Sequence, residues 1–379
     1  MPADPSPGPA ARGPRDRRAL QLWLLGIVAF AVILLLIVQA RFLLISLVIA
    51  AILFSLTSDA IGMIARLRVG QTRVANWLAS TLAVFLIASV LLTLTGIVIG
   101  QINTVVVTTL SYTDRAQVAI AELFGWMGDD VQTAVLNAMR GIDVGAYLRS
   151  AAGQAGNLTS ATVLVILFVG FMFVERAWFP TKLSRLFPDS GDAHQVEETM
   201  HMIMRRVNHY LLVKTAVSAV TGAMVYAVML AFGLELAAAM AILTFVLNYL
   251  PNIGSIIATA IVALVAYVQL GDLPTMLAVF AAVGAIQFVN GNIIDPWLMG
   301  RALRLSSFGI ILSLAFWGAV WGVPGMFLSV PIMVALMIVC SQFRALHPVA
   351  VLLSREGITT PLQDEPAQAP ARSRDHAAQ

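Results

Sequence analysis

Long uncharged apolar blocks, separated by short polar segments, run through most of this chain. Most blocks come close to the roughly 20 residues that one helix needs to cross a membrane. The alternating ten-residue segments typical of a membrane β-barrel are absent. The pattern therefore predicts an all-α polytopic membrane protein with about eight transmembrane helices. The regular blocks are residues 20–39, 42–56, 77–100, 158–174, 212–234 and 275–289.

Two further apolar blocks are longer, and each is interrupted by proline and glycine. Residues 236–270 are broken around Pro251, and residues 305–343 are broken at Pro324–Gly325. Lipid cannot hydrogen-bond an open backbone, so such breaks survive only inside protein or beside a watery cavity. We predict one or two re-entrant-type hairpins. Two tilted transmembrane spans in place of a hairpin would return the chain to the same side of the membrane, so they would fit the topology equally well. Paired breaks also indicate possible inverted repeats around a transporter's central site.

The polar segments predict the topology. Basic residues favour the cytoplasm for both termini and for the loop at 176–210, whereas the acidic excess of 101–157 favours an extracytoplasmic helical insertion. Residues 1–18 and 354–379 are expected to be disordered and cytoplasmic, on either side of a transporter domain at 19–353. Only Ala40 and Arg41 separate the first two blocks, which predicts a tight helical hairpin.

Composition excludes several classes of protein. Charged residues make up 11% of the chain and apolar residues 59%, far from the roughly 25% charge of a soluble domain. The single Cys340 allows no internal disulfide. His194 and His201 do not have metalloprotease spacing, and phosphate-binding loops and nucleophile elbows are absent. We expect no catalytic residues, bound metal, cofactor or nucleic-acid partner.

Amide side chains lie beside the first break. Asn248 and Asn252 are four residues apart, so they would share a face if the helix continued. Buried amides require partners. They could meet polar groups of a solute, or satisfy backbone groups that Pro251 leaves open, and Gly254 allows an unusual turn there.

A second polar group follows the block at 275–289. Gln287 and Asn290 stack at positions i and i+3, and Asn292 and Asp295 come next. A carboxylate at a membrane boundary is a functional candidate by default. An ion pair between Asp295 and Arg301 explains the carboxylate equally well.

Two stretches resemble the autoinducer-2 exporter family of bacterial membrane proteins. They are FVLNYLPNIGSIIA at 245–258 and the segment at 290–333, supported by Tyr210, Lys214 and Gly222. The resemblance covers roughly residues 20–353. It implies a multi-pass transporter of the bacterial inner membrane, with inverted halves and a homo-oligomeric, pentameric assembly.

Several positions depart from the family pattern. The family often has Pro-Tyr-x-Gly-Pro where this chain has residues 251–255, and Ser-Pro where it has Ser306–Ser307. It often has glutamate where Asn290 stands. The missing carboxylate weakens any proton-carrying role at that position, and Asp295 is the nearest titratable alternative.

The leading hypothesis is a secondary transporter, an exporter of a small polar solute such as an autoinducer-2-like signal molecule, driven by a proton gradient through Asp295. One alternative is a monovalent cation (Na⁺ or Li⁺)/proton antiporter, and another is a non-transporting or channel-like assembly. Partners are the lipid bilayer, the solute and H⁺ or Na⁺. The candidate solute site comprises Asn248, Pro251, Asn252, Gly254, Gln287, Asn290, Asn292, Asp295, Pro324 and Gly325.

Overall fold

The fold is helical throughout the described part of the chain. The computed structural model describes residues 14–66, 76–140, 146, 150, 153, 155–176, 178–187, 190–251, 253–299, 305–355 and 357. Within these ranges the β-type pairing is one isolated bridge, Leu305–Ser354. Seven of the helices in the described part of the chain are long and apolar enough to cross a membrane. The predicted all-α polytopic class is confirmed.

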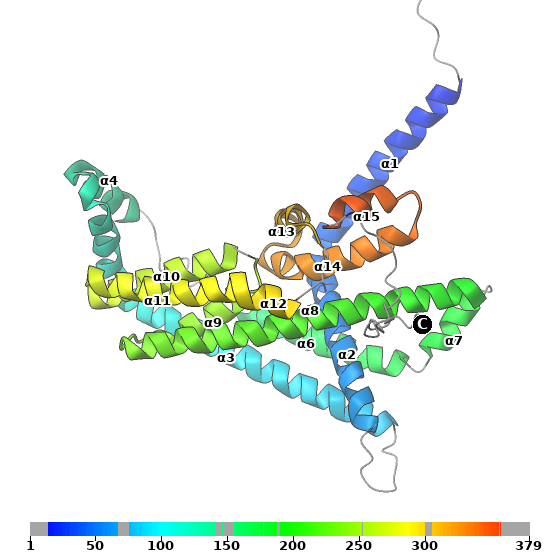
Figure 1. Cartoon of the computed structure of the whole chain (residues 1–379), viewed down its shortest axis with the longest axis horizontal. Helices are drawn as coiled ribbons and strands as arrows, with labels where there is room; N and C mark the ends of the chain where they lie inside the picture. The colour runs from blue at the N-terminus through cyan, green and yellow to red at the C-terminus, as the bar shows by residue number, and fades with distance from the viewer. Residues whose placement is uncertain are drawn as a thin grey trace, which may run out of the picture.

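Two helices are much longer than a bilayer requires (Figure 1). Helix α3 (Asn76–Leu123) has 48 residues and α8 (Ser190–Ala231) has 42, against the roughly 20 that cross the hydrocarbon core. The polar residues that flank the apolar span of α3 and of α8 are therefore helical as well. Between them lie η1 (Gly125–Met127), α4 (Asp129–Arg140), α6 (Ala155–Glu175) and α7 (Phe179–Leu186).

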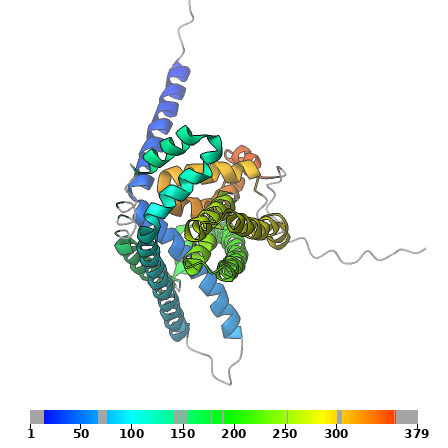
Figure 2. The same cartoon turned by 90° about the vertical axis from the view of Figure 1, so that its left-hand side faces the viewer.

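The first two helices do not form the predicted hairpin. Helices α1 (Pro14–Gln39) and α2 (Arg41–Arg66) follow one another end to end with a bend (Figures 1 and 2). The Ala40 N–H donates to Leu36 O at 2.8 Å, and the Leu44 N–H donates to Ala40 O at 3.0 Å. The prediction was wrong because the two-residue link has no glycine or proline to reverse the chain, so helical bonding continues through it.

Both predicted breaks are present. The first separates α9 (Ala237–Leu247) from α10 (Ile253–Leu270), and the second separates α13 (Ser307–Trp321) from α14 (Val323–Gln342). A Cβ on Gly254 would lie 1.7 Å from Leu247 O, and one on Gly325 would lie 2.0 Å from Trp317 O. In each hairpin the second arm therefore starts against a backbone carbonyl of the first, which only glycine permits.

The remaining helices complete the C-terminal half. Helix α11 (Leu273–Val289) passes through a π-helical turn, η2 (Asn290–Ile294), into α12 (Asp295–Met299). Helix α15 (His347–Leu353) packs on α14, and the Ser306 N–H donates to Leu353 O at 2.9 Å. Residues 1–13 and 358–379, which cover most of the two predicted disordered ends, lie outside the described residues.

Helix α8 holds the two hairpins together. One buried cluster joins it to α14 and α15 around Val207 and Val334, and another joins it to α9, α10 and α11 around Met229, Val262 and Val283. All of these side chains except Val207 are fully buried. The face of α8 between the two clusters is therefore enclosed by both broken hairpins.

Candidate functional site

A buried polar stripe runs along this enclosed face of α8. Tyr210, Lys214, Ser218 and Thr221 are spaced by four, four and three residues, so they share one face of the helix. Each residue is less than 5% exposed. Polar groups buried at this depth are costly unless they are partnered. The neighbouring helices must therefore supply hydrogen-bond or charge partners for these four side chains.

Three contacts cross from the stripe to the broken region. The Lys214 ammonium lies 2.7 Å from Asp295 Oδ2. The Asn248 amide donates to Ser218 Oγ at 3.0 Å, and the Asn290 amide donates to Thr221 Oγ1 at 2.7 Å. They tie α8 to the end of α9, to the π-turn and to the start of α12.

The partner of Asp295 is Lys214 and not a residue of the following loop. The Lys214 side chain is 5% exposed and that of Asp295 20%, so the pair is largely desolvated. Arg301, the partner considered from sequence, lies outside the described residues. A desolvated pair gains little net stability, but removing either partner leaves a lone buried charge and costs about 3–5 kcal/mol.

Several buried polar atoms next to this pair have no protein partner in the described part of the chain. They are both amide atoms of Gln287, together with Asp295 Oδ1. Gln287 is only 7% exposed. Native proteins leave few such atoms, because each costs about 1–3 kcal/mol when unsatisfied. Their concentration here indicates a site that water or a solute completes.

A cavity of about 140 Å³ lies among these groups. A water molecule takes about 30 Å³ of liquid volume, so the cavity can hold several waters or one small molecule. Its apolar lining comes partly from the second hairpin, through Ile310 of α13 and Val330 of α14. The other lining residues are Tyr210, Lys214, Asn248, Leu250, Pro251, Ser255, Gln287, Gly291 and Asp295.

Four of the residues predicted from sequence meet at this cavity: Asn248, Pro251, Gln287 and Asp295. Asn290 is buried, and its amide donates to Thr221 Oγ1. It is the first residue of the π-turn and does not line the cavity.

Four of the other predicted residues do not line the cavity. Asn292 is exposed, and its amide donates to Phe288 O of its own helix at 2.9 Å. Gly254, Pro324 and Gly325 form the helix breaks without lining the cavity. Asn252 lies outside the described residues.

The two breaks nevertheless lie next to each other. The ring of Tyr249, in the first break, lies 5.9 Å from the ring of Phe327 near the start of α14 (centroid to centroid). The Tyr249 hydroxyl also hydrogen-bonds Thr215 of α8 at 2.6 Å. Aromatic and polar contacts therefore join both breaks to α8 beside the cavity.

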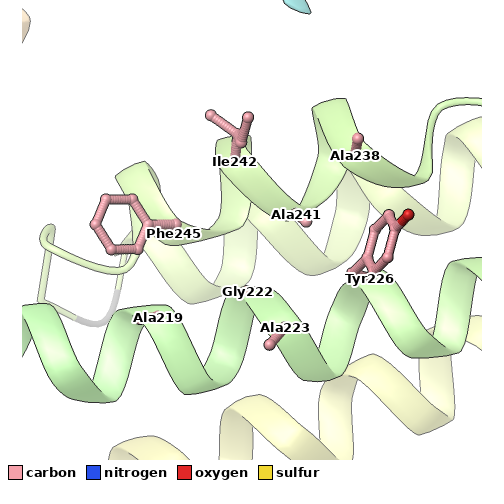
Figure 3. Close-up of a pocket in the computed structure, with 8 residues that line it drawn as sticks. All are labelled: Ala219, Gly222, Ala223, Tyr226, Ala238, Ala241, Ile242 and Phe245. Carbon is pink, nitrogen blue, oxygen red and sulfur yellow. The ribbon is translucent and has the colours of Figure 1, made fainter. Parts of the chain in front are cut away.

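A second, larger hollow between α8 and α9 has a different character (Figure 3). It measures about 310 Å³, and its lining is almost entirely apolar. A Cβ on Gly222 would lie 3.0 Å from Ala241 O, which shows how closely the two helices approach. A polar solute would find almost no partner here. The lining residues are Ala219, Gly222, Ala223, Tyr226, Ala238, Ala241, Ile242 and Phe245.

Sequence reasoning missed the α8 side of the site. Tyr210 and Lys214 entered only through the family resemblance, and Ser218 and Thr221 did not enter at all. The signal was present, because these four polar positions recur at helical spacing inside an apolar span. Among the described residues, no three His, Cys, Asp or Glu side chains form a metal-binding group.

Residues 25–345 match the family model described as AI-2E family transporter. The AI-2 transport protein TqsA of Escherichia coli (strain K12) is 37% identical over 203 residues, which cover 53% of this chain and 57% of TqsA. A candidate transport protein of Haemophilus influenzae is 32% identical over 276 residues, 71% of this chain and 79% of that protein. A candidate transport protein of Borreliella burgdorferi is 30% identical over 208 residues, 55% of this chain and 57% of that protein. The chain thus spans little more than half the length of two of these relatives.

Proposed function

The chain belongs to the AI-2E transporter family, and from this premise we propose that it exports a small polar solute as a secondary transporter. The proposed path leads through the cavity between α8 and the two broken hairpins. Its solute contacts are Lys214, Asn248, Gln287 and Asp295, which line that cavity.

The observation that carries this proposal is the Gln287 amide. Its nitrogen and its oxygen are both buried without a partner among the described residues, on the wall of a cavity large enough for a small molecule. A primary amide offers donors on one side and an acceptor on the other. A hydroxylated solute satisfies both atoms at once, and it recovers the cost of leaving them open.

The charges of the cavity favour an uncharged solute. Lys214 and Asp295 neutralise each other, and the other polar lining groups are amides and hydroxyls. A molecule with a net charge would unbalance this pair in a desolvated site. The proposed solute is therefore a small polyhydroxylated molecule such as an autoinducer-2-like signal. The similarity to TqsA, an AI-2 transport protein, supports this class.

In this proposal, the two helix breaks are the means of opening and closing the cavity. Transporters commonly build their central site from discontinuous helices and expose it alternately to the two sides. In this chain, Gly254 and Gly325 allow the two arms of each hairpin to pack at backbone distance. We propose that movement of these hairpins against α8 alternates access.

A second candidate function is monovalent cation/proton antiport, with Asp295 as the ion-binding carboxylate. The supporting observation is that Asp295 Oδ1 has no partner among the described residues, although Oδ2 is already engaged by Lys214. Sodium-dependent proton flux in proteoliposomes, in the absence of organic solute, would support the antiporter. Proton-driven solute flux without any requirement for sodium supports the exporter.

The protein is a multi-pass membrane protein of a bacterial transporter family. For its setting we propose the inner membrane, both termini in the cytoplasm, residues 19–353 as the transporter domain and a homo-oligomeric, pentameric assembly. Helix α1 has the free surface such an assembly needs, since Trp23 and Leu25 are 75% and 67% exposed. Lipid alone would cover that surface equally well.

The test is autoinducer-2 transport in proteoliposomes under an imposed proton gradient. We expect Gln287→Leu to reduce transport by at least about tenfold, because the cavity loses its open donor and acceptor. Asn292→Leu is the matched control, since its exposed amide donates to Phe288 O of its own helix. The proposal fails if purified wild-type protein moves no autoinducer-2, or if Gln287→Leu transports as well as Asn292→Leu.

A further inference from the structure

The π-turn η2 interrupts an otherwise regular helix beside the cavity. The Asp295 N–H donates to Asn290 O, five residues earlier, in place of the four-residue spacing of an α-helix. Such a turn contains one extra residue, and π-turns are frequent at functional sites. Here Asn290 begins the turn and Asp295 follows its last residue.

This extra residue decides which side chains share a face. Gln287 and Asp295 are eight residues apart, so on a continuous α-helix they would diverge by roughly 80°. One inserted residue reduces the separation to seven α-helical steps, which leaves the two side chains within roughly 20° of each other. The π-turn therefore places both Gln287 and Asp295 on the cavity wall. Without it, Ile294 would occupy the angle that Asp295 now holds.

One hydrogen bond anchors the turn to a neighbouring helix. The Asn290 amide donates to Thr221 Oγ1 at 2.7 Å, and that hydroxyl donates to Val217 O at 2.8 Å. Asn290 and Thr221 are 4% and 2% exposed. A buried chain of this kind is strong, because its bonds polarise one another in a medium of low dielectric constant.

We propose that Asn290 and Thr221 are positioning residues that hold the π-turn and thereby aim Asp295 at Lys214 and into the solute cavity. Asn290 then acts through the turn and does not contact the solute, in line with its absence from the cavity lining. This inference rests on the proposed function for the identity of the solute site. The geometry it predicts can be tested without any solute.

The test is cysteine cross-linking between α8 and the end of the turn. In a Cys340→Ala background, which removes the single cysteine of the chain, Lys214→Cys is paired with Asp295→Cys. In the second pair it is combined with Ile294→Cys and Asp295→Asn, so that no unpaired buried carboxylate remains. A short bifunctional thiol reagent then reports which position faces α8. With the anchor intact, the 214–295 pair is expected to cross-link at least about tenfold faster than the 214–294 pair, because the two positions point roughly 100° apart.

Loss of the anchor is expected to switch the partner. Thr221→Val and Asn290→Ala should each slow the 214–295 cross-link and accelerate the 214–294 cross-link, by about tenfold for one lost hydrogen bond. In the double variant, the rates of the two cross-links should change no more than in either single variant, since both substitutions remove the same hydrogen bond. Thr221→Ser should retain the original pattern. Thr259→Val is the matched control, because that hydroxyl bonds only its own helix, at Ser255 O.

A misfolded variant would slow both cross-links, whereas the inference requires one to fall and the other to rise. It is overturned if neither Thr221→Val nor Asn290→Ala changes the preferred partner, or if the Thr259→Val control produces the same switch. The transport assay and the cross-linking assay test the two proposals independently. A switch in a protein that moves no autoinducer-2 supports the inference and refutes the proposed solute, while transport without a switch refutes the inference alone.

Discussion

Replacing Gly254 by alanine tests the geometry of the first break. The new Cβ would lie 1.7 Å from Leu247 O, and ordinary contact starts at 3.4 Å, so the two arms would have to separate by 1.7 Å. The obstacle is a backbone carbonyl, which cannot rotate away as a side chain can. Overpacking of a well-packed site costs about 1–3 kcal/mol. Since rigid backbone must move here, we expect a loss of at least about 2 kcal/mol in unfolding free energy.

Gly284→Ala is the matched control and should change stability in the opposite direction. It lies within α11, and its Cβ would meet only Thr259 Cγ2 at 3.9 Å. Alanine should therefore add up to about 1 kcal/mol through its helix propensity. The assay is equilibrium unfolding of purified protein in mixed detergent micelles. Equal effects of the two substitutions, or a Gly254→Ala protein as stable as wild type, would refute the close packing of α10 against α9.

Two further substitutions follow from buried partners. Lys214→Ala should lower the unfolding free energy by about 3–5 kcal/mol, because Asp295 keeps an unpaired charge, whereas Lys214→Met combined with Asp295→Asn should cost less. A double variant less stable than the single variant in micelle unfolding would contradict the pairing. Trp321→Phe removes the indole hydrogen bond to Ile37 O, which is 3.1 Å long and lies beside the α1–α2 bend. It should cost about 1 kcal/mol, while Trp297→Phe, at a site that is 81% exposed, should cost nothing measurable in the same assay.

Much of the fold could be predicted from the positions at which the apolar blocks of the sequence end or are interrupted. The breaks at Pro251 and Pro324 were predictable, because proline and glycine inside a long uncharged block leave backbone groups that lipid cannot satisfy. The bend at Ala40 was not predicted, because the charged Arg41 between two apolar blocks suggested a reversal, although the link has no glycine or proline to make one. The length of α3 was also hidden, because a helix can continue past the membrane surface without any change in its backbone bonding.

The site was predictable in part for a similar reason. Amides and a carboxylate inside apolar sequence stand out, so Asn248, Gln287 and Asp295 were recognised as candidates. Ser218 and Thr221 did not stand out, because hydroxyl side chains in membrane helices usually bond their own backbone. The π-turn is joined to α8 by the Asn290–Thr221 hydrogen bond, a contact that no local pattern of the sequence specifies.

The most direct test of a solvated polar cavity is thiol labelling at two adjacent positions of α11. Gln287 is 7% exposed and lines the cavity, whereas Phe288 is 65% exposed on the outer surface of the helix. In the Cys340→Ala background, Gln287→Cys should react in membranes with a small, polar, membrane-impermeant thiol reagent, because water fills the cavity that this position lines. Phe288→Cys, facing lipid, should stay unreactive. Labelling at 288 but not at 287 would contradict the account, because water would then reach the outside of α11 and not the enclosed site.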